Sequence, residues 1–136
     1  MNIRKVNFES YKDHKGEIWV IDNLINQIFI PRRIFRISNV PKDTSRGNHA
    51  HLVCEQFIIA TKGNCRVKID NGFEDESIIL EEFNFGILLP KLHWIQMYNF
   101  SANCELLVLA SEIYDDKEII SDYKIFSIYA RSSDRK

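Results

Sequence analysis

Charge of one sign and long apolar runs are both missing from this sequence. The 18 Lys and Arg residues stand against 19 Asp and Glu residues, and the formal net charge is -1. A balanced chain offers no overall basic surface to nucleic acid or to an anionic membrane. No apolar run approaches the ~20 residues of a membrane-spanning helix. We therefore expect neither nucleic acid nor a membrane as a partner.

Cysteine is scarce as well. The chain contains Cys54, Cys65 and Cys104, an odd and widely spaced set that does not indicate a disulfide framework. Each lies in an apolar, strand-like stretch, where a free thiol packs as a small core residue. The segment after Met1 is polar and lacks the apolar centre of a secretion signal. These features predict a reduced protein of the cytoplasm.

The remaining composition is that of a globular domain. Apolar residues make up 45% of the 136 positions and charged residues 27%, which is ordinary for a chain that builds a core. The length suits one domain and is short for two. We expect a single domain over residues 1–136, with a polar, frayed tail from about Arg131.

Short strands account for most of the chain. Runs rich in β-branched and aromatic residues alternate with turn formers, and we count roughly eight to ten strands. Besides the stretch described next, the expected strands cover residues 6–11, 16–22, 32–37, 56–60, 65–69, 85–89, 93–98 and 106–110, with a further one within 74–82. Asp115 or Asp116 is expected to cap a short helix over 117–123. This pattern predicts an all-β sandwich or barrel.

The most informative stretch is Arg46-Gly47-Asn48-His49-Ala50-His51. Two histidines one residue apart lie on the same face of an extended strand. Gly47 permits a tight turn, and Arg46 brings a fixed cation to the same place. Two imidazoles and a guanidinium projecting from a rigid strand indicate a functional site. A hydrogen-bonded core pair of histidines is the less favoured alternative.

A second arginine lies on a strand with apolar neighbours. In the strand 32–37, Arg33 shares a face with Phe35 and Ile37. An unpaired buried charge is costly, so Arg33 needs either water or a partner. A solvated strand end and a role as an anion ligand both remain open.

The glycine and histidine spacing resembles the two cupin motifs. The first match comprises Gly47, His49, His51, an acid or amide, and Gly63; the second, looser match comprises Gly86, Pro90, His93 and Asn99. The resemblance implies a jelly roll with a short C-terminal helix, whose motif side chains point into the barrel mouth. Cupins include metal enzymes, metal-free enzymes and binding modules, so the fold alone leaves the function open.

A metal-dependent cupin enzyme is one alternative. His49, His51, Glu55 and His93 are the four side chains that could supply its ligands. The usual acid position falls on Gln56 as well as on Glu55, and an amide is a poor ligand. A register change of one residue also decides whether His93 points inward.

A closer resemblance is to the nucleotide-sugar 3,4-ketoisomerases, small cupins that act on dTDP-4-keto-6-deoxyglucose. The matching segments are the Arg46–His51 element with Gln56 behind it, residues 98–101 and residues 107–111. The similarity runs from about Val6 to Tyr123, and the Arg-Gly-x-His-Ala-His element is its most specific part.

The resemblance implies an enzyme that forms a dTDP-3-keto-6-deoxyhexose for 3-amino-3,6-dideoxyhexoses of bacterial surface glycans. It implies a homodimer with exchanged strands that needs neither metal nor cofactor. The catalytic residues would be His49 and His51, with His51 as the base. The residues expected at the substrate are Arg33, Arg46, Gln56, Trp94 and Tyr98, with Arg46 on the diphosphate and Trp94 near the sugar or base.

Imidazole suits this chemistry, because its unperturbed pKa of ~6.5 lets it act as both acid and base. Phe35 and Arg36 stand where the family often has tyrosines, which keeps a non-catalytic sugar-nucleotide-binding cupin as an alternative. A 3,5-epimerase of the same fold usually has one catalytic histidine, so the second histidine favours ketoisomerisation.

Overall fold

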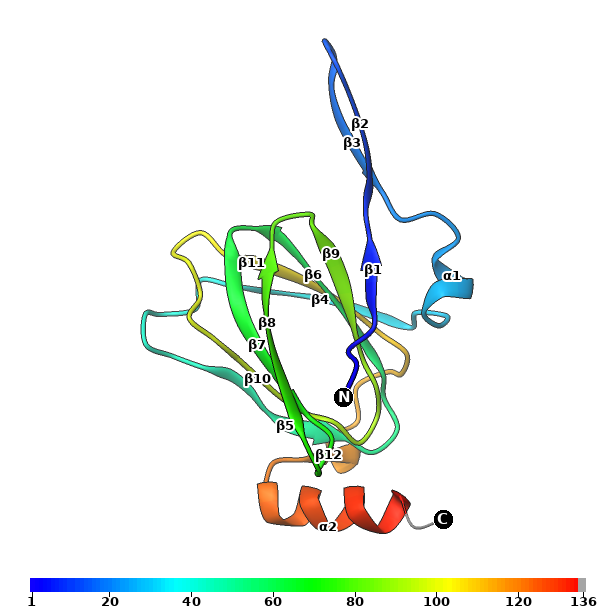
Figure 1. Ribbon diagram of the computed structural model, residues 1–136, viewed down its shortest axis with the longest axis vertical. Coiled ribbons are helices and arrows are strands. Elements are labelled where there is room, and N and C mark those ends of the chain that lie inside the picture. The colour runs from blue at the N-terminus through cyan, green and yellow to red at the C-terminus, as the bar shows by residue number, and fades with distance from the viewer. Residues whose placement is uncertain (135–136) are drawn as a thin grey trace.

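The computed structural model describes residues 1–134, which form two facing antiparallel sheets (Figure 1). In spatial order the first sheet contains β1 (Lys5–Asn7), β9 (Phe85–Leu89), β6 (Gln56–Lys62), β11 (Glu105–Ala110) and β4 (Arg33–Ser38). The second contains β12 (Ile119–Ile120), β5 (Arg46–His51), β10 (Trp94–Tyr98), β7 (Asn64–Asp70) and β8 (Asp75–Glu81). The predicted all-β class is confirmed.

The main core lies between the two sheets and follows the period-two pattern of the strands. In β7, Cys65, Val67 and Ile69 are buried while Arg66 is exposed, as the sequence predicts. The corresponding inward residues of β11 are Leu106, Val108 and Ala110. Alternation of this kind fixes which face of each strand meets the core.

The first sheet is also covered on its outer face. In β6, Ile58 and Ala60 point into the main core, whereas Phe57 and Ile59 belong to a second apolar cluster. That cluster includes Val6, Phe8, Ile21, Leu24, Ile28, Phe29 and Leu109, from β1, β11 and the segment around the short helix α1 (Leu24–Gln27). A strand that is apolar on both faces is thereby buried on both sides.

A hairpin of β2 (Glu9–Asp13) and β3 (Gly16–Val20) projects away from both sheets (Figure 1). Its turn lies where the sequence predicts it, with Asp13 opposite Gly16. Trp19 stacks on Phe83 at 5.6 Å between ring centroids, and this contact ties the base of the hairpin to the loop before β9. Most residues of the two strands are exposed.

The C-terminal part differs from the prediction. The expected helix over 117–123 is replaced by a 3₁₀ turn, η1 (Asp116–Glu118), and by β12, because two β-branched isoleucines pair with β5. Asp115 does cap η1, accepting a hydrogen bond from the Lys117 amide. The longer helix α2 (Tyr123–Asp134) begins after Asp122, whose carboxylate accepts from the Ile125 amide.

Helix α2 lies across one end of the sheets (Figure 1). Phe126 and Ala130 pack on Ala50 and Ile120 beneath β5 and β12. The tail predicted to fray from Arg131 instead forms the last turn of α2, and the Arg131 guanidinium donates to the Gly72 carbonyl. Residues 135 and 136 lie outside the described part. No helix within residues 1–134 is long and apolar enough to cross a membrane.

Gly86 on β9 allows the Phe57 ring to pack closely, and this contact can be tested. A Cβ atom at position 86 would lie 2.1 Å from the Phe57 ring. We expect Gly86→Ala to lower the free energy of unfolding by about 1–3 kcal/mol through overpacking. Urea denaturation of Gly86→Ala with and without Phe57→Leu measures the coupling. An equal loss in both backgrounds would contradict the proposed clash.

Candidate active site

Strand β5 presents the two predicted histidines on the inner face of the second sheet. His49 is half-buried and His51 is 3% exposed. Their rings meet edge to face, with 4.9 Å between centroids. Ala50 points the opposite way, into the cluster under α2. The prediction that both imidazoles share a face is therefore confirmed.

A bulge at Asn48 brings Arg46 to the same face. The register pairs Ile95 with His49, Gln96 with Gly47 and Met97 with Arg46, so that Asn48 is the extra residue. Asn48 has a left-handed φ of 59°, which is typical of a bulge residue that changes the phase of a strand. Met97 is buried in the core, and residues opposite each other in a ladder share a face. Strict alternation would have placed Arg46 on the face of β5 that points away from the histidines.

Gly47 makes this bulge possible. Its φ is +86°, and a Cβ atom there would lie 2.8 Å from the Ile95 carbonyl oxygen. Both the backbone conformation and the close approach of β10 therefore require glycine.

Glu118 is a site residue that the sequence reasoning missed. One of its carboxylate oxygens, Oε2, contacts Nδ1 of His51. The other, Oε1, accepts hydrogen bonds from the backbone amides of Val53 (3.1 Å) and Cys54 (2.9 Å). Glu118 lies on η1, 67 positions after His51, and nothing in the local sequence distinguishes it from the neighbouring acids.

The Glu118 carboxyl is held in its ionised form. Burial by itself would raise its pKa. The hydrogen bonds from Cys54, His51 and Val53 outweigh burial, and the pKa of Glu118 lies below its ordinary value. A buried carboxylate with three donors is consistent with this direction.

Two buried side-chain nitrogens in the described residues have no hydrogen-bond partner: Nε2 of His51 and Nε of Arg33. Buried polar atoms are nearly always paired, so an unpaired one needs an explanation. Both belong to residues predicted for the site. A core pair of histidines with every nitrogen satisfied is not what the structure contains.

Arg33 lies on the interior face of the other sheet. Its guanidinium is over the rings of Phe35 and Tyr114, at 5.0 and 5.5 Å from the ring centroids. The ladder aligns Arg33 with Ala110 and Gln56 in one row across three strands. Gln56 is buried, so this row brings an amide and a guanidinium onto the face that looks toward β5.

The pKa of His49 lies below its ordinary value. The main cause is burial, which disfavours the charged imidazolium, and the neighbouring His51 and Arg46 act in the same direction. A hydrogen bond to the Gly47 backbone and the charge of Glu118 oppose this shift. His49 is therefore a neutral imidazole at neutral pH, able to accept a proton.

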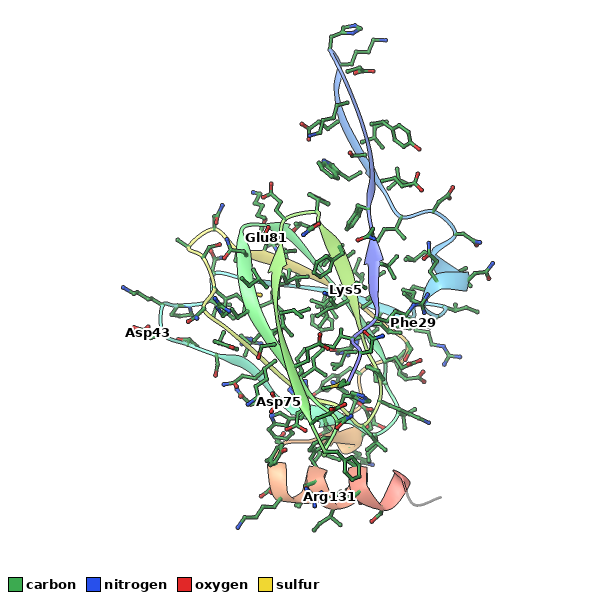
Figure 2. The ribbon with its side chains drawn as sticks, viewed as in Figure 1. Lys5, Phe29, Asp43, Asp75, Glu81 and Arg131 are labelled. Atoms are coloured by element: carbon green, nitrogen blue, oxygen red, sulfur yellow. The ribbon has the colours of Figure 1, made fainter. Side chains whose placement is uncertain are left out.

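A cavity of about 280 Å³ opens beside Arg46, between β4 and the loop that precedes β5. It is lined by Phe35, Arg36, Ile37, Ser38, Asn39, Val40, Pro41, Thr44 and Arg46. Figure 2 shows Asp43 at the tip of this loop, pointing away from the sheets. The two arginines give the cavity a cationic rim that suits an anionic ligand.

Trp94 and Tyr98 do not join the histidines. On β10 the buried Ile95 and Met97 point inward, so Trp94 and Tyr98 face outward. Trp94 packs on Tyr123 and Phe126 of α2, at 5.3 and 5.7 Å. The expectation that both residues touch the substrate is not supported by this geometry, because α2 occupies the face that Trp94 presents.

The alternative metal site is not assembled either. Among the side chains that the structure describes, no group of three His, Cys, Asp or Glu is close enough to hold an ion. His93, one of the four proposed ligands, donates from Nδ1 to the Lys91 carbonyl at 2.9 Å. It lines a separate cavity of about 80 Å³ together with N-terminal residues such as Met1 and Asn2.

Comparison with known proteins gives matches over nearly the whole chain. The TDP-4-oxo-6-deoxy-alpha-D-glucose-3,4-oxoisomerase of Aneurinibacillus thermoaerophilus is 32% identical over 129 residues, which are 95% of this chain and 93% of that protein. Among solved structures, WlaRA from Campylobacter jejuni, a TDP-fucose-3,4-ketoisomerase, is 37% identical, covers 96% of both chains and has a TM-score of 0.85.

A histidine-to-asparagine mutant of the 3,4-ketoisomerase QdtA from Thermoanaerobacterium thermosaccharolyticum was solved in complex with TDP-4-keto-6-deoxyglucose. It is 30% identical, with a TM-score of 0.89 over 96% of this chain and 95% of that one. The family described as WxcM-like, C-terminal matches residues 1–131. The resemblance inferred from the Arg-Gly-x-His-Ala-His element is thereby confirmed, and the chain belongs to the WxcM-like family.

Proposed function

We propose that this protein is a sugar-nucleotide isomerase of deoxysugar biosynthesis that converts TDP-4-keto-6-deoxyglucose into a TDP-3-keto-6-deoxyhexose. The observation that carries the proposal is the pair of inward-facing imidazoles on β5, in a chain whose relatives are TDP-sugar 3,4-ketoisomerases. The free state of all three cysteines suits the cytoplasm, where such a substrate would be available.

The reaction needs only proton transfers. The hydrogen at C3 of a 4-keto sugar is acidic, because the carbanion left behind delocalises into the carbonyl as an enediolate. A base removes this proton, and a proton is returned at C4 while another passes from the C3 oxygen to the C4 oxygen. Substrate and product are isomers, so the balance requires neither an oxidant nor a reductant. Two imidazoles side by side can perform both transfers.

Within this scheme His51 acts on the carbon-bound proton and His49 on the proton shared by the oxygens. Arg46 binds the diphosphate, for which a planar guanidinium offers paired hydrogen bonds. Arg33 and Gln56 contact the sugar from the facing sheet, which would give the unpaired Arg33 Nε a partner. Trp94 and Tyr98 have no part in the scheme.

We further propose a homodimer in which the β2–β3 hairpin is exchanged. Tyr11 and Ile18 lie directly opposite each other in the hairpin and are 60% and 61% exposed. Figure 2 shows side chains on both sides of the hairpin, with no other described segment against its outer part. An exposed two-stranded ribbon is only marginally stable alone, so a partner chain would stabilise it.

The reaction can be followed directly by proton NMR. We expect the protein to convert TDP-4-keto-6-deoxyglucose in deuterated water into a 3-keto product, without added metal or cofactor. The coupling of the new proton at C4 gives the product epimer. Exchange at C5 without transfer of the ketone would instead indicate an epimerase, and binding without any change would indicate a non-catalytic cupin.

The catalytic pair can be tested by substitution. We expect His51→Asn to abolish isomerisation, by the order of 10²–10⁴-fold that general acid–base catalysis contributes, while TDP affinity stays within a few-fold. His93→Asn is the matched control, because His93 lies outside the pair, and it should retain activity. Loss of activity in the control variant would favour the metal-dependent alternative.

The dimer can be tested in solution by light scattering coupled to size exclusion. We expect the unmodified chain to have the mass of two copies. Ile18→Lys, which puts a charge beside Tyr11 on the exposed face of the hairpin, should increase the monomer fraction. Ile79→Lys, at an exposed isoleucine of β8, is the control and should not. A monomeric wild-type protein would refute the exchanged hairpin.

A further inference from the structure

We propose that Glu118 is a positioning residue that fixes the tautomer of His51, so that Nε2 is the atom that takes the proton from the substrate. The identity of that proton rests on the proposed function, whereas the tautomer itself does not. Glu118 touches no reacting atom in this scheme and acts through His51 alone.

The hydrogen-bond inventory of the two side chains dictates the tautomer. An ionised carboxylate can only accept hydrogen bonds, and a neutral imidazole has one donor and one acceptor nitrogen. Oε2 of Glu118 lies against Nδ1 of His51, so Nδ1 must carry the hydrogen. Nε2 is then left with its lone pair free.

The free nitrogen belongs to the histidine that lies against the second imidazole of the proposed catalytic pair. Nε2 is buried and has no partner among the described residues. His51 projects from β5 beside the His49 ring, on the side that faces the row of Arg33 and Gln56. A proton acceptor with no protein partner, held next to a second imidazole, suits the base that the proposed reaction requires.

The surrounding chain holds the carboxylate in one orientation. The amides of Val53 and Cys54 fix Oε1, which leaves Oε2 for His51. The Glu118 carbonyl accepts from the Leu52 amide at 2.8 Å. In the next residue, Ile119 pairs with His51 across the β12–β5 ladder. Glu118 is thus tied to β5 through both its side chain and its backbone.

The same contact would stabilise His51 after it has taken a proton. Protonation at Nε2 makes the imidazole a cation, whose Nδ1 hydrogen remains on the carboxylate. Return of the proton to the sugar restores the original tautomer, because Glu118 keeps the hydrogen on Nδ1 throughout. The carboxylate neither gains nor loses a proton in this cycle.

The tautomer of the unmodified protein can be measured by long-range proton–nitrogen NMR correlations, with the His51 signals assigned through their loss in His51→Asn. We expect a protonated Nδ1 and a bare Nε2. A His51 ring with the hydrogen on Nε2 would overturn the inference, whatever the activity of the protein.

Glu118→Gln tests whether the carboxylate sets the tautomer of His51, because it replaces one acceptor oxygen by an NH₂ donor and keeps the size and shape of the side chain. The amide oxygen of the glutamine would keep the hydrogen bonds from the backbone amides of Val53 and Cys54. Its NH₂ group would then face Nδ1 of His51 and donate a hydrogen bond to it. We expect the hydrogen to move to Nε2, and kcat to fall by the order of 10²–10⁴-fold while TDP affinity stays within a few-fold. Glu118→Asp retains a carboxylate and should keep the original tautomer and part of the activity.

Glu81→Gln is the matched control, since Glu81 is an exposed residue of β8, which β10 and β7 separate from β5 in the second sheet. It should change neither the tautomer nor kcat. Full activity or an unchanged tautomer in a folded Glu118→Gln would refute the role of Glu118. If Glu118→Gln does not fold, the inference is tested by the His51 tautomer in the wild type and in Glu118→Asp. Both should carry the hydrogen on Nδ1, and a hydrogen on Nε2 instead would refute the role of Glu118.

The two proposals fail in different ways. A wild-type protein with the expected tautomer, reversed in Glu118→Gln, but without isomerase activity would refute the proposed function and support the role of Glu118. An active isomerase with the opposite tautomer would refute the role of Glu118 and leave the function in place.

Discussion

One buried contact between an imidazole and a carboxylate joins the middle of this chain to its C-terminal part. His51 lies on β5 and Glu118 on η1, 67 positions later. The same carboxylate accepts hydrogen bonds from the backbone amides of Val53 and Cys54, which lie in the loop between β5 and β6. A single side chain therefore satisfies three donors that an apolar interior would otherwise leave unpaired. His51 has a defined orientation only when the segment after Asp115 is in place.

The two faces of β5 have different roles, with packing on the outer face and the candidate site on the inner face. Ala50 anchors the strand to Ile120 and Phe126 on the outer side, and this packing places α2 and β12. The inner side carries the two imidazoles and, through the bulge at Asn48, the guanidinium of Arg46. A rigid strand with packing on its back holds side chains more firmly than a loop would, which suits groups that must meet a substrate in one geometry.

Sequence patterns predicted the parts of this arrangement that depend on local periodicity. Burial of one face explains why alternation identified strands such as 65–69, and the same rule placed the two histidines together. Alternation could not place Arg46, because the extra residue Asn48 shifts the phase of the strand. It could not decide the role of Trp94 or find Glu118, because both depend on how the distant C-terminal segment packs.

The two histidines have unequal surroundings, and this inequality matters more than their shared face. His51 is enclosed and paired with an ionised carboxylate. His49 is half-buried, its pKa is lowered by burial, and no carboxylate of the described residues forms a hydrogen bond with it. Environments that differ in this way give two chemically identical groups different roles in acid–base catalysis. A carboxylate partner favours the residue that must hold a full positive charge after taking a carbon-bound proton. A neutral imidazole that feels the charge of Arg46 is suited to pass a proton between two oxygens without holding charge. Within the proposed reaction, this difference favours His51 as the carbon base and His49 as the oxygen shuttle.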